Sequence, residues 1–392
     1  MKKTMAWIMA AAMCLTATAC GSTVSSTVST AGSTVEGAFN LGLICPLSGS
    51  SAVSGQIMQN ATKMAVDEIN AAGGINGTIP INLVSVDDEG VPATSVTAMQ
   101  KLVEQDKVNA VIGAQASSCT LANMEITKAA KIPQITPASS NVAVTQSGND
   151  YIYQLTATDE LHMRNVMGYM VDENNAKTFA ILYESSDFGT GGFKIASTVC
   201  DDFGLEMVDS EVYNSGDTDF SVPLADAQSK GAELVFLPMY YQPASLIFAQ
   251  AKSMGYAPDW FGVDGMDGIL TLDGFDVALA EDVMLLTPFN ADSSDERTQA
   301  FVQKYQEQYG EVPNQFAADA YDCVYAYKQA LETAGATPDM DAATLCDLMI
   351  QQFTSMTFDG LTGTGMTWDT NGRVSKDPKG MVIKDGAYVG LD

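Results

Sequence analysis

The stretch LICPLSGSSAVSGQIMQNATKMAVDEINAAGGING, residues 43–77, decides the fold. It begins with the end of an apolar strand that closes at Cys45-Pro46, and a Ser/Gly-rich turn then leads into a helix near Ser54. The pair Gly73-Gly74 ends that helix. A strand that delivers a polar turn to a helix N-terminus presents unpaired N–H groups, which favour an anion. The stretch therefore predicts an α/β unit with a polar loop at the start of its helix.

Strands and helices alternate along most of the remaining chain. Short apolar segments are followed by helical patterns, which is typical of βαβ units and parallel sheets. Because this series runs twice, the sequence predicts an α/β fold with two doubly wound parallel-sheet domains. The predicted strands are 39–45, 79–86, 110–113, 134–136, 178–183, 206–213, 234–238 and 260–263, and the predicted helices are 54–72, 91–104, 121–130, 189–202, 222–230, 244–255, 295–310, 314–334 and 342–352.

The N-terminal residues have the pattern of an export signal. Two lysines precede a short apolar run, and Ala17-Thr18-Ala19-Cys20 follows. This order predicts a signal peptide over residues 1–19. The cysteine predicts a lipoprotein with lipid attached at Cys20, and ordinary cleavage before it, giving an unanchored exported protein, is the alternative. The Ser/Thr/Gly-rich residues 20–37 predict a flexible tether.

The charge and cysteine content exclude several function classes. The chain has 48 acidic and 19 basic residues, for a net charge of −29, so neither nucleic acid nor an anionic lipid surface is expected as a partner. With one histidine, no P-loop and no Gly-x-Ser-x-Gly motif, we expect no enzyme activity, metal or cofactor. Scattered cysteines in apolar contexts are expected to be core residues, although one pair could form a disulfide: Cys45, Cys119, Cys200, Cys323 and Cys346.

Residues 43–77 and the loops after the later strands resemble the branched-chain amino acid receptors of ABC importers, which are type I periplasmic binding proteins. The resemblance covers about residues 39–392. It implies two lobes joined by a hinge of three chain crossings, with a ligand in the cleft between them. The implied lobes are 38–157 with 288–358 and 158–287 with 359–392, and the implied crossings are 156–159, 286–289 and 358–368.

Two serine-rich loops resemble the carboxylate-binding loops of this family. Each follows a predicted strand, at residues 113–118 and 136–140. The resemblance assigns a ligand carboxylate to Ser117 or Ser118, to the backbone of Ser139 and to the hydroxyl of Ser140. The alternative for such serines is an ordinary helix cap.

An acidic residue after a strand is the implied partner of the ligand ammonium group. The matching position is Asp264, in the segment Gly262-Val263-Asp264-Gly265, with Asp267 as a weaker second candidate. Asp159, at the first implied crossing, also matches an acidic position near the ligand nitrogen. A turn aspartate is the alternative for Asp264.

The resemblance places the ligand side chain among aromatic residues. Phe188 stands where relatives commonly have tyrosine, and Tyr240 and Tyr241 match an aromatic pair that closes over the ligand. Ser54 stands where branched-chain receptors have tyrosine, which argues against simple Leu/Ile/Val specificity. Packing at a strand end is the alternative for the two tyrosines.

The function implied by the resemblance is capture of an amino acid outside the cytoplasm. The protein would be a monomer, anchored to the bacterial membrane by its lipid, that delivers its ligand to ABC permease subunits. Two alternatives stay open: a sensor that reports the ligand to a signalling receptor, and a binder of amides or aromatic acids.

Overall fold

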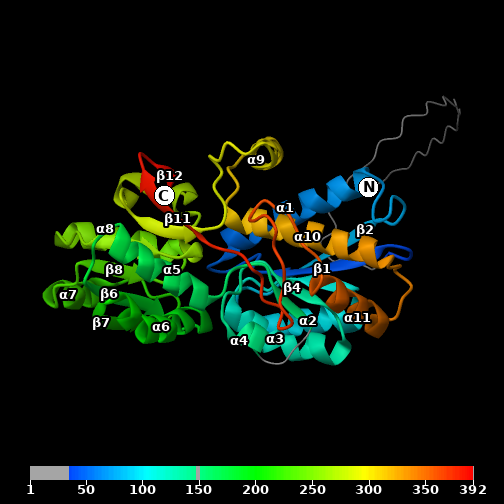
Figure 1. Ribbon diagram of the computed structural model, residues 1–392, viewed down its shortest axis with the longest axis horizontal. Helices are drawn as coiled ribbons and strands as arrows, with labels where there is room; N and C mark the ends of the chain where they lie inside the picture. The colour runs from blue at the N-terminus through cyan, green and yellow to red at the C-terminus, as the bar shows by residue number, and fades with distance from the viewer. Residues whose placement is uncertain (1–34, 147–150, 392) are drawn as a thin grey trace, which may run out of the picture. The chain divides into compact units, whose positions relative to one another are not determined.

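The computed structural model describes residues 35–146 and 151–391, and its strands form two sheets (Figure 1). The predicted signal peptide, Cys20 and most of the predicted tether lie outside the described residues. The sheet orders are β2-β1-β3-β4-β5 and β12-β11-β10-β9-β8-β6-β7. In the described part of the chain, no helix has the length and apolar character needed to cross a membrane.

The first lobe is built on the five-stranded parallel sheet. Its central strand β1 (Phe39–Cys45) is buried at every position, as expected for a parallel strand covered on both faces. The other strands are β2 (Ile81–Asp87), β3 (Ala110–Ile112), β4 (Gln134–Thr136) and β5 (Ile152–Gln154), and the helices are α1 (Ala52–Ala71), α2 (Pro92–Gln100), α3 (Ser117–Ala130), α4 (Ala143–Gln146), α9 (Glu296–Tyr309), α10 (Gln315–Ala334) and α11 (Ala342–Phe353), with a π-helical turn at Lys101–Gln105.

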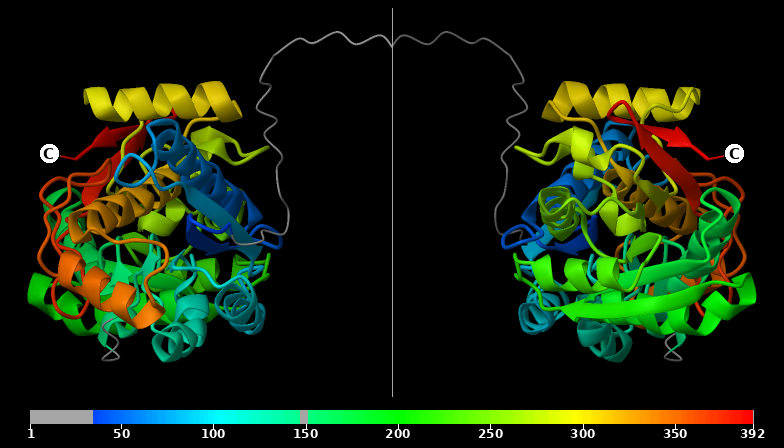
Figure 2. Two further views of the ribbon diagram at one scale, coloured as in Figure 1. Left: turned by 90° about the vertical axis from the view of Figure 1, so that its right-hand side faces the viewer. Right: turned by 90° about the vertical axis from the view of Figure 1, so that its left-hand side faces the viewer.

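Helices from both halves of the chain complete this lobe. The long helices α1 and α10 pack against each other over one face of the sheet, and α2 packs against α3 on the other. Figure 2 shows α9 on the outer side of α1 and α10. The first lobe is therefore discontinuous in sequence.

The second lobe is built on the seven-stranded sheet. Its strands from β6 to β10 are parallel, and β11 and β12 add antiparallel edge strands. The strands are β6 (Thr178–Glu184), β7 (Glu206–Tyr213), β8 (Leu234–Leu237), β9 (Asp259–Gly262), β10 (Met284–Thr287), β11 (Lys379–Lys384) and β12 (Ala387–Gly390), and the helices are α5 (Asp159–Asp172), α6 (Asp187–Val199), α7 (Ser221–Ser229) and α8 (Tyr241–Met254).

Local sequence signals explain where the helices begin and end. Asp295 and Asn314 accept hydrogen bonds from the first backbone N–H groups of α9 and α10. Gly255, Gly310 and Gly335 follow the last residues of α8, α9 and α10 in the left-handed conformation, which glycine adopts without strain. The predicted fold class, two parallel-sheet α/β lobes, is confirmed.

The chain passes between the two sheets three times. It does so between β5 and α5, between β10 and α9, and between α11 and β11. The third passage differs from the implied crossing at 358–368, because Met366, Trp368 and Val374 still belong to the apolar core of the first lobe. The indole of Trp368 also donates to the Gln154 carbonyl at 2.8 Å. The chain therefore leaves the first lobe only after Val374, at residues 375–378.

All five cysteines outside the signal region are buried and free in the described structure. They lie on separate elements and belong to the apolar interior, as in β1 and α10. Burial raises the pKa of the Cys119 and Cys346 thiols to about 12, which keeps them unreactive.

Candidate functional site

A cavity of about 620 Å³ lies between the two lobes. The first lobe contributes the turn after β1, the loop before α2 and the start of α3. The second lobe contributes the starts of α6 and α8 and the loop after β7. The polar residues that line the cavity include Ser50, Ser51, Gln115, Ser117, Ser118, Glu184, Ser185, Ser186, Asp187, Thr190, Ser215, Asp217, Thr218 and Gln242.

Among the helices that begin at this cavity are α3, α6 and α8. The N-terminus of α6 is capped by Ser186, whose Oγ accepts from the N–H of Gly189 at 3.3 Å. The residues before α3 and α8, Ala116 and Tyr240, provide no side-chain cap. Their first N–H groups, together with the helix dipoles, suit a carboxylate in the cavity.

The predicted carboxylate serines differ in their surroundings. Ser117 and Ser118 line the cavity, and Ser117 Oγ accepts from the N–H of Asn141 at 3.3 Å. Ser139 is fully buried, and its Oγ contacts the Thr120 hydroxyl at 2.8 Å and donates to first-lobe carbonyls. Its N–H donates to the Thr136 hydroxyl, so both polar groups of Ser139 act within the lobe.

Ser140 and Asp159 form a buried polar pair at the first passage. The Asp159 N–H donates to the Ser140 carbonyl at 2.8 Å. Apart from each other, neither the carboxylate of Asp159 nor the hydroxyl of Ser140 has a hydrogen-bond partner within the described residues. Asp159 is 1% exposed, and burial raises its pKa to about 7. The Ser140 hydroxyl acts against this rise, and the charge of Asp264 adds to it. A buried acceptor and hydroxyl left unpaired are costly unless a ligand supplies partners.

Asp264 is also buried, but it already has polar neighbours. Its carboxylate accepts from the N–H of Gly265 at 3.0 Å and from the Thr156 hydroxyl at 3.5 Å. His162 Nδ1 lies 3.8 Å from the same carboxylate, and burial lowers the pKa of this histidine. Asp264 therefore joins α5 and the first passage to the loop after β9.

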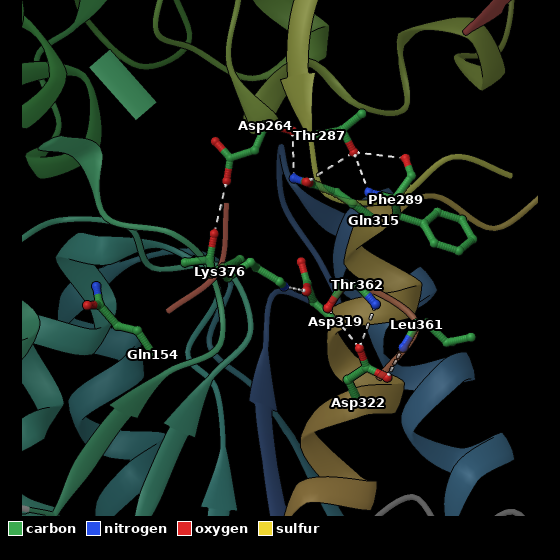
Figure 3. Close-up of polar contacts among 12 residues, drawn as sticks. Gln154, Asp264, Thr287, Phe289, Gln315, Asp319, Asp322, Leu361, Thr362 and Lys376 are labelled. Carbon is green, nitrogen blue, oxygen red and sulfur yellow. Dashed lines mark hydrogen bonds and ion pairs between the residues drawn. The ribbon is translucent and has the colours of Figure 1, made fainter. Parts of the chain in front are cut away.

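The segment after β9 connects to α10 through Asp267, Gln315 and Thr287. Figure 3 shows the contacts of Gln315 with Asp264 and Thr287. The Gln315 side chain donates to the Asp264 carbonyl at 2.8 Å, and its N–H donates to the Asp267 carboxylate at 2.8 Å. The Thr287 hydroxyl donates to the same carboxylate at 3.2 Å. Burial raises the pKa of Asp267 to about 6. Asp267 therefore has a structural role at the second passage, where it joins the end of β10 to the start of α10.

Only part of the predicted aromatic wall lines the cavity. Phe188 and Tyr240 both line it, with ring centroids 5.3 Å apart. Tyr241 and Ser54 are buried behind the lining. The Ser54 hydroxyl contacts the Gln115 side chain, whose Nε2 lies 2.8 Å away. Ser54 thus orients a side chain that lines the cavity.

Sequence reasoning missed several residues at this site, among them Gln115, Asn141 and Gly191. Asn141 Nδ2 donates to the carbonyl of Asp187 at 2.7 Å, a bond from one lobe to the other. The signals in the sequence were weak, since Gln115 and Asn141 stand next to the predicted serines and Gly191 reads as an ordinary helix residue.

The comparisons with known proteins agree with this architecture. A model of the periplasmic binding protein family matches residues 38–387. An amino acid binding protein of Pseudomonas aeruginosa is 30% identical over 58% of this chain and 60% of its own length. The leucine-, isoleucine-, valine-, threonine- and alanine-binding protein of the same organism is 26% identical over 78% of this chain and 82% of its own.

A solved structure extends the likeness over nearly the whole described chain. It is the branched-chain amino acid transporter substrate-binding protein LivJ of Streptococcus pneumoniae in complex with isoleucine. The TM-score is 0.80 at 28% identity, covering 90% of this chain and 100% of that one. The chain therefore belongs to the type I periplasmic binding proteins, in the family of the branched-chain amino acid receptors.

Proposed function

We propose that this protein is a solute-binding lipoprotein that captures an amino acid between its lobes and delivers it to an ABC permease. The observation that carries the proposal is the unpaired buried set of Asp159 and Ser140 close to the uncapped start of α3. An acceptor pair and a group of free N–H donors complement the two charged ends of a zwitterionic amino acid.

Each part of the ligand has a proposed partner. The carboxylate binds at the N–H groups and hydroxyls of Ser117 and Ser118, and the ammonium binds Asp159 and Ser140. Phe188 and Tyr240 contact the side chain, with Gln115 as a polar neighbour. Asp159 and Ser140 are buried just outside the cavity lining, as are Asp264, Ser139, Ser54 and Tyr241. Asp264, Ser139 and Ser54 already have hydrogen-bond partners, so we assign them, with Tyr241, a supporting role.

The ligand of this chain need not be a branched-chain amino acid. The hydroxyl and amide groups of the cavity lining can hydrogen-bond a polar side chain, and Ser54 leaves the first-lobe wall without an aromatic ring. The solved relative with isoleucine supports the amino acid class for the proposal. The proposed function also includes lipid attachment at Cys20 and a monomeric state.

Thermal-shift screening of the purified protein tests this function. The set should include the natural amino acids, matched acids without the α-ammonium, such as benzoate, and amides. Ligand at 100 times its Kd adds about 2.7 kcal/mol to the free energy of unfolding, so a true ligand raises the Tm clearly. We expect at least one amino acid to do so and its deaminated analogue to fail. Equal shifts from acids that lack the ammonium would contradict the proposal.

The anchor is tested by membrane fractionation of cells that express the parent and Cys20→Ala proteins. We expect the parent in the membrane fraction and the variant outside it. A parent protein that is released without lipid would favour ordinary cleavage before Cys20.

A further inference from the structure

One side-chain hydrogen bond joins the two lobes beside the cavity. Asn141 lies in the loop between β4 and α4 of the first lobe, and Asp187 is the first residue of α6 in the second. The Asn141 amide donates to the Asp187 carbonyl at 2.7 Å, and Asn141 is 9% exposed. Any motion that separates α6 from this loop must break that bond.

The first lobe fixes Asn141 through three other contacts. Its Oδ1 accepts from the N–H of Ala143 at 2.9 Å, and its own N–H donates to Ser117 Oγ. Its carbonyl accepts from the Gln154 side chain at 3.2 Å. With these groups engaged, the side-chain NH₂ projects toward the second lobe in a set orientation.

Gly191 supplies the space that this amide needs. Asp187 and Gly191 are four residues apart in α6, so they lie on the same face of the helix. A Cβ at position 191 would lie 2.8 Å from Asn141 Nδ2 and 2.6 Å from Asp159 Oδ2. Both distances are too short for a carbon atom, so a side chain here would displace the amide or the carboxylate.

We propose that Asn141 is a positioning residue that holds the two lobes closed, and that Gly191 forms the gap that receives its amide. This inference rests on the proposed function, because closure of the cleft is taken to retain the ligand. The bond involves no ligand atom. It therefore favours the closed conformation with any ligand, and its loss should weaken different ligands by the same factor.

The test variant is Asn141→Ser. A serine hydroxyl can still accept from the N–H of Ala143, as in other short turns, but it is too short to reach Asp187. The matched control is Asn214→Ser, because the hydrogen bonds of Asn214 in the described part of the chain are with Ser185 and Asp217 of the second lobe. Both variants make the same chemical change near the cavity, and only one removes a bond between the lobes.

The first measurement is the distance between the lobes in the unliganded protein. Spin labels on cysteines introduced at Val53 in α1 and Val222 in α7 suit this purpose, since these side chains are 46% and 69% exposed. The five cysteines of the described residues are buried and should not react, and Cys20 is replaced by alanine in every labelled variant. We expect Asn141→Ser to shift the distance distribution toward longer values and Asn214→Ser to leave it unchanged. An unchanged distribution in Asn141→Ser would overturn the proposal.

The second measurement is the affinity for the amino acids found by the screen. Loss of one hydrogen bond should raise the Kd of each about threefold to tenfold in Asn141→Ser. Gly191→Ala should weaken binding by itself, because its Cβ also crowds Asp159. In this background Asn141→Ser should have little further effect, because the Asn141 amide is already displaced. If Asn141→Ser raised the Kd by the same factor in the Gly191→Ala background as in the parent, the proposed role of Gly191 would be wrong. If the parent binds no amino acid, the proposed function fails, while the unliganded distances still decide on Asn141.

Discussion

At the scale of single residues, the structure distinguishes Asp264, which the resemblance implied as the ammonium partner, from Asp159, which it placed near the ligand nitrogen. Asp264 matches the family position, but its partners are Gly265, Thr156 and His162. Among the described residues Asp159 has no side-chain partner apart from Ser140, and its pKa is raised to about 7. The two acids differ in their hydrogen-bond partners because of contacts between segments about a hundred residues apart. A local sequence pattern cannot predict such contacts.

The raised pKa predicts how ligand affinity depends on pH. An ammonium group binds the ionised form of Asp159, whereas the unliganded protein holds this carboxyl protonated below about pH 7. Binding below that pH must release a proton, so the affinity should fall by about tenfold per pH unit. Titration calorimetry between pH 5 and 8 measures this slope.

Asp159→Asn is the control for this pH dependence. The variant should bind the same amino acid more weakly at pH 8, by about 1.5–3 kcal/mol for a lost bond to a charged group. It should also lose the slope below pH 7, because the titrating group is gone. A slope that persists in Asp159→Asn would assign the proton to another group, such as Asp267.

At the scale of elements, the sequence predicted most strands and helices but misplaced the third passage. Strand and helix periods are local properties, and β1, β4 and β7 have the predicted bounds. The segment around Trp368 was assigned to the hinge, yet its indole packs against Phe353 and Phe358 of the first lobe. Such packing depends on distant residues, so the pattern of the segment itself could not reveal it.

The third passage is joined to α10 by a buried ion pair between Lys376 and Asp319 (Figure 3). Their side chains are 1% and 3% exposed. We expect Lys376→Met to lower the free energy of unfolding by about 3–5 kcal/mol, because it leaves a buried carboxylate unpaired. Burial raises the pKa of Asp319 to about 7 even beside the lysine, so the loss should shrink at acidic pH, where the carboxyl is protonated.

Urea unfolding at pH 8 and pH 5 measures this loss. Lys63→Met in α1 is the matched control, since Lys63 pairs with Asp67 at the surface, where the side chains are 44% and 53% exposed. Its effect should stay at or below about 0.5 kcal/mol. Equal losses in the two variants would show that the buried pair does not stabilise the third passage.

At the scale of the whole molecule, the surplus of acidic residues sets how stability responds to salt. Removal of Lys2 and Lys3 with the predicted signal peptide takes the net charge from −29 to −29 − 2 = −31. Most of the 48 acidic residues cannot find a partner among 19 basic ones, so repulsion among them opposes the compact state. Added salt screens repulsion and attraction alike, and the repulsive pairs are in the majority.

We therefore expect the Tm at pH 8 to rise as NaCl increases from about 10 to 150 mM, a range over which the Debye length falls from about 30 to 8 Å. A rise of about 2 °C would correspond to roughly 1 kcal/mol for a chain of this size. The same increase in salt should have little effect near pH 4.1, the isoelectric point, because the net repulsion is then absent. Scanning calorimetry at both pH values makes the comparison. A Tm that falls with salt at pH 8 would mean that attractive pairs, such as the one between Lys304 and Glu68, outweigh the repulsion.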